Sequence, residues 1–193
     1  MVPKGKLLII GGAVDLGSSL NYNENISHPH YVKFFELGIL KRIIRESAKA
    51  ENSVVEVITT ASKIPEIVGE EYINSFKQLQ VNNVNVMDIR SRTDAMIPEY
   101  LERIAKADVV MFTGGYQLRL SSIFGGTPFL HLLKKRYHED NFLIAGTSAG
   151  AAAASTNMIY RGSSSEALIK GEVQITAGLG FIDSVIVDTH FVQ

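Results

Sequence analysis

The sequence predicts a three-layer α/β domain built around a mostly parallel β-sheet. Short apolar runs rich in β-branched residues recur along the chain, and amphipathic segments with helical periodicity separate them. Continuous apolar runs are typical of strands that are covered on both faces. Strands that alternate with helices need crossover connections, and such connections make neighbouring strands parallel.

The expected strands share an apolar composition and are followed by glycine or polar residues. They are residues 6–10, 53–60, 84–89, 108–112, 142–145 and 184–187. In an open parallel sheet, ligands bind outside the carboxyl ends of the strands. We therefore look for functional residues directly after these runs.

The segments between the expected strands carry helix signals. In the first of them, Leu37, Leu40 and Ile44 recur at a spacing of three and four residues, which places them on one face of a helix. Ser62 is expected to cap the next helix, with Pro65 in its first turn. The expected helices span about residues 31–50, 62–80, 98–106 and 127–138.

The composition excludes several classes of partner. With 19 Lys and Arg against 20 Asp and Glu, the net charge is −1, so no broad field is expected to hold nucleic acid or an anionic membrane. The absence of cysteine excludes a disulfide framework, a thiol nucleophile and a thiolate metal site. The apolar run at 7–10 is too short for a signal peptide or a membrane span. We expect a cytoplasmic protein of one domain, residues 1–193, with no nucleic-acid or membrane partner.

The Gly-Thr-Ser-Ala-Gly run at 146–150 is the strongest local motif. It follows an expected strand and precedes four alanines that favour a helix, which is the context of a G-x-S-x-G nucleophile elbow. Small residues must flank Ser148 if its hydroxyl is to project into a cleft, and the amide of Ala149 can then face a developing oxyanion. The alternative is a tight glycine turn whose serine only caps the helix.

A nucleophilic serine needs a base, and the histidines differ in how well they fit that role. His190 follows the last expected strand, where a base can reach a cleft at the sheet edge; a histidine of the core is the alternative. His131 and His138 fall on an expected lysine-rich helix and are interpreted as solvated. His28 and His30 lie in a polar loop without nearby acidic ligands, so no metal site is expected.

A second glycine-containing segment, Thr-Gly-Gly-Tyr-Gln at 113–117, follows the expected strand at 108–112. Its glycines let backbone amides approach a ligand, and Gln117 can hydrogen-bond a carboxylate or an amide of a substrate. A plain turn is the alternative. The glycines at 11–12 complete neither a dinucleotide-binding nor a phosphate-binding motif.

Three segments in this order resemble the cyanophycinase family: the turn at 113–117, the serine motif at 146–151 and the Asp-Thr-His-Phe-Val-Gln end at 188–193. The resemblance is collinear from Gly11 to the last residue. Cyanophycinases are serine exopeptidases with a flavodoxin-like sheet, related to dipeptidase E and the class I glutamine amidotransferases. They cut cyanophycin, a polyaspartate with arginine on its side-chain carboxylates, into β-aspartyl-arginine dipeptides.

The resemblance implies a role for each matching residue. Ser148 is the implied nucleophile, His190 the general base and Glu166 the acid that orients the histidine. The residue patterns alone leave other acids open for that last role, namely Glu172, Asp183 and Asp188. The amides of Gly115 and Ala149 are the implied oxyanion hole, and no metal or organic cofactor is implied. The implied substrate-binding residues are Gln117, Asp188 and Thr189.

The sequence departs from the family pattern in two ways. Tyr116 stands where the family usually has asparagine, and it is expected to narrow the substrate pocket. Thr189 stands where the family usually has glutamine, and it is a shorter hydrogen-bond donor. The chain also stops at Gln193, whereas family members continue with an arginine-rich stretch. We therefore expect that the domain lacks its C-terminal segment.

The resemblance predicts a serine peptidase that releases β-Asp-Arg dipeptides from cyanophycin through a Ser–His–Glu triad and an acyl-enzyme. It also implies a homodimer. Two alternatives stay open: a dipeptidase-E-like enzyme acting on aspartyl dipeptides, and a non-catalytic relative that binds aspartyl peptides.

Overall fold

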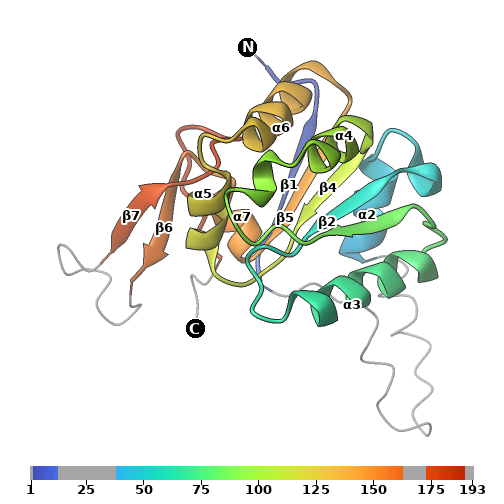
Figure 1. Ribbon diagram of the computed structural model, residues 1–193, viewed down its shortest axis with the longest axis horizontal. Coiled ribbons are helices and arrows are strands. Elements are labelled where there is room, and N and C mark those ends of the chain that lie inside the picture. Colours follow the sequence, from blue (N-terminus) through green and yellow to red (C-terminus); the bar gives the residue numbers. More distant parts are fainter. Residues whose placement is uncertain (1, 13–37, 163–172, 190–193) are drawn as a thin grey trace, which may run out of the picture.

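The central element is a five-stranded parallel sheet (Figure 1). The computed structural model describes residues 2–12, 38–162 and 173–189. The strands lie in the order β1-β5-β4-β2-β3. Their bounds are β1 Lys6–Ile10, β2 Val55–Ile58, β3 Val84–Met87, β4 Val109–Phe112 and β5 Leu143–Thr147. All five were expected from the apolar runs, with ends that differ by a few residues.

Helices cover both faces of the sheet, so the prediction of a three-layer α/β fold is confirmed (Figure 1). The helices are α2 Ile39–Glu46, α3 Pro65–Gln78, α4 Pro98–Lys106, α5 Gln117–Phe124, α6 Pro128–Glu139 and α7 Ala149–Ala153, with 3-10 turns η2 Ala50–Asn52 and η3 Asp94–Met96. The helix expected at about 127–138 is α6, and Thr127 caps it, since its side chain accepts a hydrogen bond from the Leu130 amide. None of the described helices is long and apolar enough to cross a membrane.

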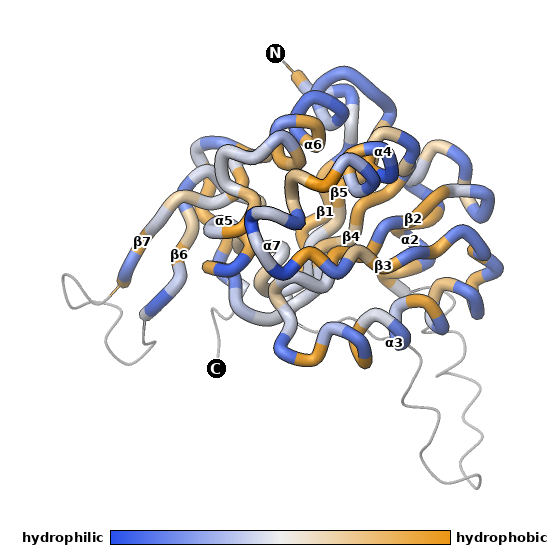
Figure 2. Tube along the Cα trace, in the orientation of Figure 1, coloured by the Kyte–Doolittle hydropathy of each residue, from blue (hydrophilic) through white to orange (hydrophobic). Residues whose placement is uncertain are grey.

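Each strand sends alternate side chains to two separate cores. In β4, Val110 and Phe112 join the core beneath α4, α5, α6 and α7, whereas Val109 and Met111 join the core beneath α2 and α3. This alternation is the two-residue period of a strand, and it explains why the strand sequences are apolar throughout. The strands are accordingly the hydrophobic centre of Figure 2.

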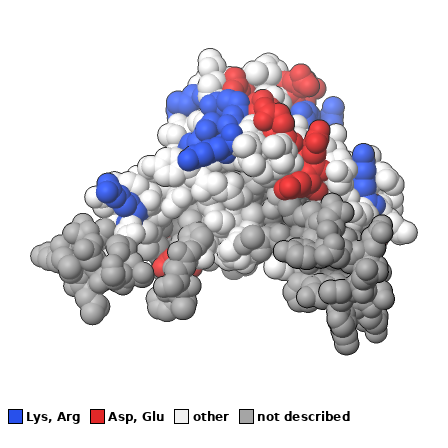
Figure 3. Space-filling view, turned by 90° about the horizontal axis from the view of Figure 1, so that it is seen from below, with Lys and Arg blue, Asp and Glu red and all other residues white. Residues whose placement is uncertain are grey.

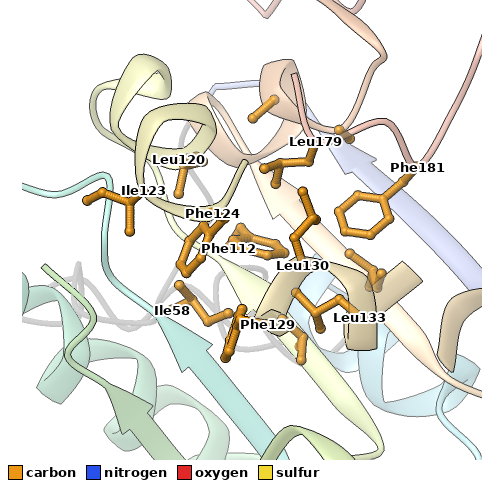
Figure 4. Packing of buried hydrophobic residues seen from close by; sticks show 14 of the residues in the cluster. Ile58, Phe112, Leu120, Ile123, Phe124, Phe129, Leu130, Leu133, Leu179 and Phe181 are labelled. Carbon is orange, nitrogen blue, oxygen red and sulfur yellow. The ribbon is translucent and has the colours of Figure 1, made fainter. Parts of the chain in front are cut away.

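Aromatic rings fill the core on the α5–α6 side (Figure 4). The ring of Phe112 lies edge-on to that of Phe124 with centroids 6.1 Å apart, and Phe124 stacks on Phe129 at 5.0 Å. Phe181, from the segment after the last strand, also contacts Phe112, with centroids 6.4 Å apart. These contacts hold the end of β4 in place, which is where one of the candidate functional turns begins.

A two-stranded antiparallel ribbon stands beside the sheet, and the sequence patterns did not predict it. Its strands are β6 Asn157–Arg161 and β7 Gln174–Ala177. Helix α5, which was also not predicted, lies next to this ribbon, as Figure 1 shows. The Gln117 side chain donates from Nε2 to the Ile159 carbonyl at 3.2 Å and links the two.

Two expectations about local structure are wrong. The strand expected at 184–187 does not form: Val185 and Ile186 are 46% and 42% exposed, and Ser184 has a φ of 60°, which breaks an extended run. Ser62 does not cap α3, which begins after Ile64. The Ser62 hydroxyl instead accepts a hydrogen bond from the Ile64 amide at 3.1 Å, a local turn that serine favours.

Described charged side chains of both signs share one face of the molecule. On the face seen in Figure 3, lysine and arginine lie beside aspartate and glutamate. This distribution agrees with the net charge of −1.

Candidate active site

Ser148 lies between β5 and α7, at the carboxyl edge of the sheet. Its backbone has φ 47° and ψ −107°, a conformation that costs a residue with a side chain of the order of 1–3 kcal/mol. Two backbone hydrogen bonds hold it there: the Ser148 amide donates to the Ile10 carbonyl at 3.0 Å, and its carbonyl accepts from Ala152 at 2.9 Å. A strained serine at a strand-to-helix turn is the defining feature of a nucleophile elbow.

The two glycines of the motif are required by close backbone contacts. A Cβ on Gly146 would lie 2.5 Å from the carbonyl carbon and oxygen of Gly150, and a Cβ on Gly150 would lie 2.6 Å from the Cβ and the carbonyl oxygen of Phe112. Helix α7 therefore packs directly on the ends of β5 and β4. This packing explains the G-x-S-x-G pattern on physical grounds.

Replacing Gly150 by alanine should destabilise the domain by about 1–3 kcal/mol, because the added methyl group forces α7 away from β4. Urea unfolding followed by circular dichroism measures this change. Gly11→Ala is the matched control, since no atom of the described residues lies within 4 Å of its Cβ position. Equal stability of the two variants would contradict the packing described for the elbow.

The Ser148 side chain does not cap α7. It makes no capping hydrogen bond, although Ser148 occupies the N-cap position. The alternative of a serine kept only to start a helix therefore does not account for the residue. Ala149 is the first residue of α7, and its amide has no acceptor within the helix because of that position.

The glycine turn after β4 lies against the serine. A Cβ on Gly114 would be 3.5 Å from the Ser148 Cβ and 4.0 Å from its Oγ. Gly115 has a φ of 139°, and a Cβ there would lie 2.2 Å from the Ala61 carbonyl oxygen, so only glycine fits. The Tyr116 amide donates to the same oxygen at 2.9 Å, which anchors the turn.

Two of the predicted elements are therefore brought together, namely the serine motif and the Gly114–Gly115 turn. Gln117 begins α5 and is half-buried, with its Nε2 bound to Ile159. Asp188 is exposed and Thr189 half-buried. The segment directly before Asp188 is anchored to the rest of the fold, since the Val187 amide donates to Ser155 Oγ at 3.2 Å.

Other predicted residues lie outside the described residues. These are His190 and Glu166, together with His28 and His30. His131 and His138, by contrast, are exposed on α6, as interpreted from the sequence. Within residues 2–12, 38–162 and 173–189, no three histidine or acidic side chains cluster as metal ligands.

Sequence reasoning missed the contribution of Thr147 to this edge of the sheet. Its hydroxyl donates to the Gly12 carbonyl at 2.8 Å, which joins the ends of β5 and β1 beside the serine. The only sequence signal was a threonine inside the G-x-S-x-G motif. That position is variable in the motif, so the signal carried no specific expectation.

The fold and the site define an α/β protein with a strained serine in a strand-to-helix turn at the carboxyl edge of a parallel sheet, which is the backbone pattern of a nucleophile elbow. The model of one family, described as peptidase family S51, matches residues 25–193. The chain belongs to this family.

Among curated relatives, the chain is 32% identical over 188 residues to a cyanophycinase from Geminocystis herdmanii, covering 97% of this chain and 62% of that protein. It is 36% identical over 140 residues to a cyanophycinase from Synechococcus elongatus, covering 72% of this chain and 44% of that protein. The matches thus span between 44% and 62% of the length of these relatives.

A solved structure of a peptidase from an acI-B1 actinobacterium has the same fold. The two superpose with a TM-score of 0.66 at 20% sequence identity, and the match covers 93% of this chain and 65% of the other. This likeness supports the α/β fold described above.

Proposed function

We propose that the chain is a serine exopeptidase of the cyanophycinase kind, with Ser148 as its nucleophile. The observation that carries the proposal is the strained Ser148 backbone next to the Gly114–Gly115 turn. Strain of this kind is retained where a side chain must be presented to a substrate. Membership of peptidase family S51 and the cyanophycinase relatives support the same reading.

In the proposed first half-reaction, Ser148 Oγ attacks the scissile carbonyl carbon while His190 accepts the hydroxyl proton. Glu166 accepts a hydrogen bond from the imidazole and holds it in the required orientation. When the C–N bond breaks, His190 gives the proton to the leaving amine. The acyl group then remains on Ser148 as an ester.

In the second half-reaction, water attacks the ester carbonyl and His190 takes its proton. The ester bond breaks, Ser148 regains a proton from His190, and the acid product leaves. The amides of Gly115 and Ala149 are the proposed donors to the oxyanion of both tetrahedral intermediates. The positive φ of Gly115 and its contact with Ala61 support this role, because they set a fixed direction for the turn.

The proposed substrate is cyanophycin, and the proposed product is the β-Asp-Arg dipeptide. The cyanophycinase relatives support this choice over other peptides. Gln117, Asp188 and Thr189 are the proposed substrate contacts. Asp188 is exposed and suits a guanidinium or an amino group of the substrate.

Incubation with cyanophycin separates the proposal from its alternatives. We expect release of β-Asp-Arg, measured by chromatography and mass spectrometry. Hydrolysis of α-linked aspartyl dipeptides without attack on cyanophycin would instead favour the dipeptidase-E-like alternative. Tight binding of aspartyl peptides without hydrolysis, in a sample with a cooperative unfolding transition, would favour the non-catalytic alternative.

A further inference from the structure

Arg90 holds the turn that follows β2, although no sequence pattern marked this residue. Its Nη1 donates to the Thr59 carbonyl at 3.2 Å, and its Nη2 donates to the Ser62 carbonyl at 2.9 Å. Thr59 and Ser62 are both buried, and buried carbonyls need hydrogen-bond partners. The backbone of Arg90 is fixed as well, since its amide donates to Asp94 Oδ2 at 2.8 Å. The guanidinium therefore ties two carbonyls of one turn to the segment after β3.

The turn at 59–62 supports the glycine turn after β4. The Ala61 carbonyl oxygen accepts a hydrogen bond from the Tyr116 amide at 2.9 Å. A Cβ on Gly115 would lie only 2.2 Å from that oxygen and 2.9 Å from the Ser62 nitrogen, so the two turns pack backbone against backbone. Because no flexible side chain lies between them, a displacement of the turn at 59–62 displaces Gly115 as well.

Gly115 is one of the two proposed oxyanion donors, and its amide is available for that role. None of the described residues accepts a hydrogen bond from the Gly115 amide. The neighbouring Gly114 brings the turn against the serine, since its Cβ position is 3.5 Å from the Ser148 Cβ. An oxyanion donor must lie about 2.7–3.1 Å from the developing charge, so the support of this turn affects the rate.

We propose that Arg90 is a positioning residue for the oxyanion hole of the proposed peptidase. It fixes the turn at 59–62, this turn fixes Gly115, and the Gly115 amide keeps its direction toward the substrate carbonyl at Ser148. Charge-assisted hydrogen bonds are stronger than neutral ones, and the planar guanidinium fork spans two carbonyls at once. The inference rests on the proposed function, because it concerns a residue that serves the same reaction.

Arg90→Gln is expected to lower kcat for release of β-Asp-Arg from a soluble cyanophycin fragment by about 10- to 100-fold, because a loosened oxyanion donor loses transition-state stabilisation. KM should change by less than about twofold, since Arg90 acts on the turn and not on the substrate. Arg90→Lys keeps the charge but loses the fork, so its kcat should lie between those of Arg90→Gln and the parent. An unchanged kcat in Arg90→Gln would overturn the positioning role.

Arg136→Gln is the matched control for a purely structural effect. Arg136 also donates from Nη1 to two backbone carbonyls, those of Ile104 and Ala107. Its guanidinium lies 4.4 Å from the ring centroid of Phe142, which precedes β5, so this contact is at the opposite edge of the sheet from Ser148. Arg136→Gln should lower the midpoint of denaturant unfolding but leave kcat unchanged. An equal loss of kcat in the two variants would assign the effect to general destabilisation and refute the proposal.

Amide hydrogen exchange, measured by NMR, tests the link without any substrate. In Arg90→Gln the Tyr116 amide should exchange about 10-fold faster relative to the amides of β4, because its acceptor Ala61 is no longer held. Arg136→Gln should leave this ratio unchanged. If the ratio rises in Arg90→Gln although the unmodified protein releases no dipeptide, the peptidase proposal fails and the link from Arg90 to the Gly115 turn stands. An unchanged ratio in Arg90→Gln would refute the link.

Discussion

Replacing Ser148 by alanine is expected to reduce release of β-Asp-Arg by about four to six orders of magnitude. The change removes the atom that attacks the carbonyl, and other triads lose about this much activity when the nucleophile is removed. Alanine keeps the Cβ of serine, so the backbone strain at φ 47° and the packing of α7 are unchanged. We therefore expect the free energy of unfolding to stay within about 0.5 kcal/mol.

Ser47→Ala is the control for this experiment. Ser47 lies directly after α2, and its hydroxyl contacts Ser53 Oγ at 2.8 Å, at the edge of the sheet opposite to Ser148. Its loss should leave turnover unchanged. Activity of Ser148→Ala above one tenth of the parent value would remove the serine from the proposed mechanism.

Replacing Arg103 by methionine is expected to destabilise the domain by about 3–5 kcal/mol. Arg103 on α4 donates from Nη2 to Glu56 Oε2 at 2.5 Å and from Nε to Oε1 at 3.2 Å. It also donates to the Val86 carbonyl at 3.0 Å. Glu56 is only 2% exposed at the centre of β2, so the variant leaves a buried carboxylate without its cation.

Denaturant unfolding of Arg103→Met measures this cost. The matched control on the same helix is Lys106→Met, which removes an exposed cation 4.0 Å from Glu102. That pair is 77% and 72% exposed, so its loss should cost less than about 0.5 kcal/mol. If both variants unfolded at the same denaturant concentration, the buried pair would not be a main contact between the sheet and α4.

The central sheet followed from the sequence because each strand faces two cores. Val109, Val110, Met111 and Phe112 are all buried, and such a run is typical of a strand covered on both faces. The same rule produced the error at 184–187. Val185 and Ile186 are equally β-branched, yet both are exposed in an irregular segment with a positive φ at Ser184. Apolar composition alone therefore does not establish a strand at a chain segment that lacks sheet neighbours.

Helix α5 and the β6–β7 ribbon had no comparable signal. The first turn of α5 contains Gln117 and Arg119, and its apolar spacing is weak; tertiary contacts such as Gln117 with Ile159 support it. The ribbon strands are largely solvent-exposed, and even Ile175 of β7 is 51% exposed. Such strands show little alternation of apolar and polar residues, so the sequence pattern does not reveal them.

The candidate site was predictable where backbone geometry restricts the residue type. Gly115, Gly146 and Gly150 each lack room for a Cβ. Because only glycine fits at these positions, the sequence showed them as recognisable motifs. The positive φ of Ser148 agrees with the elbow that the motif at 146–150 predicted. His190 was predicted as the base from its place after the expected strand at 184–187 and from the family resemblance, whereas Glu166 came from the resemblance alone; both roles stay predictions.

The most direct test of a serine mechanism is covalent labelling with a fluorophosphonate, followed by intact-mass and peptide mass spectrometry. The account predicts one adduct per chain, located on Ser148 and absent in Ser148→Ala. It also predicts that labelling abolishes dipeptide release from cyanophycin. A folded protein that takes up no adduct, or that takes it up on another serine while Ser148 stays unmodified, would contradict Ser148 as the nucleophile.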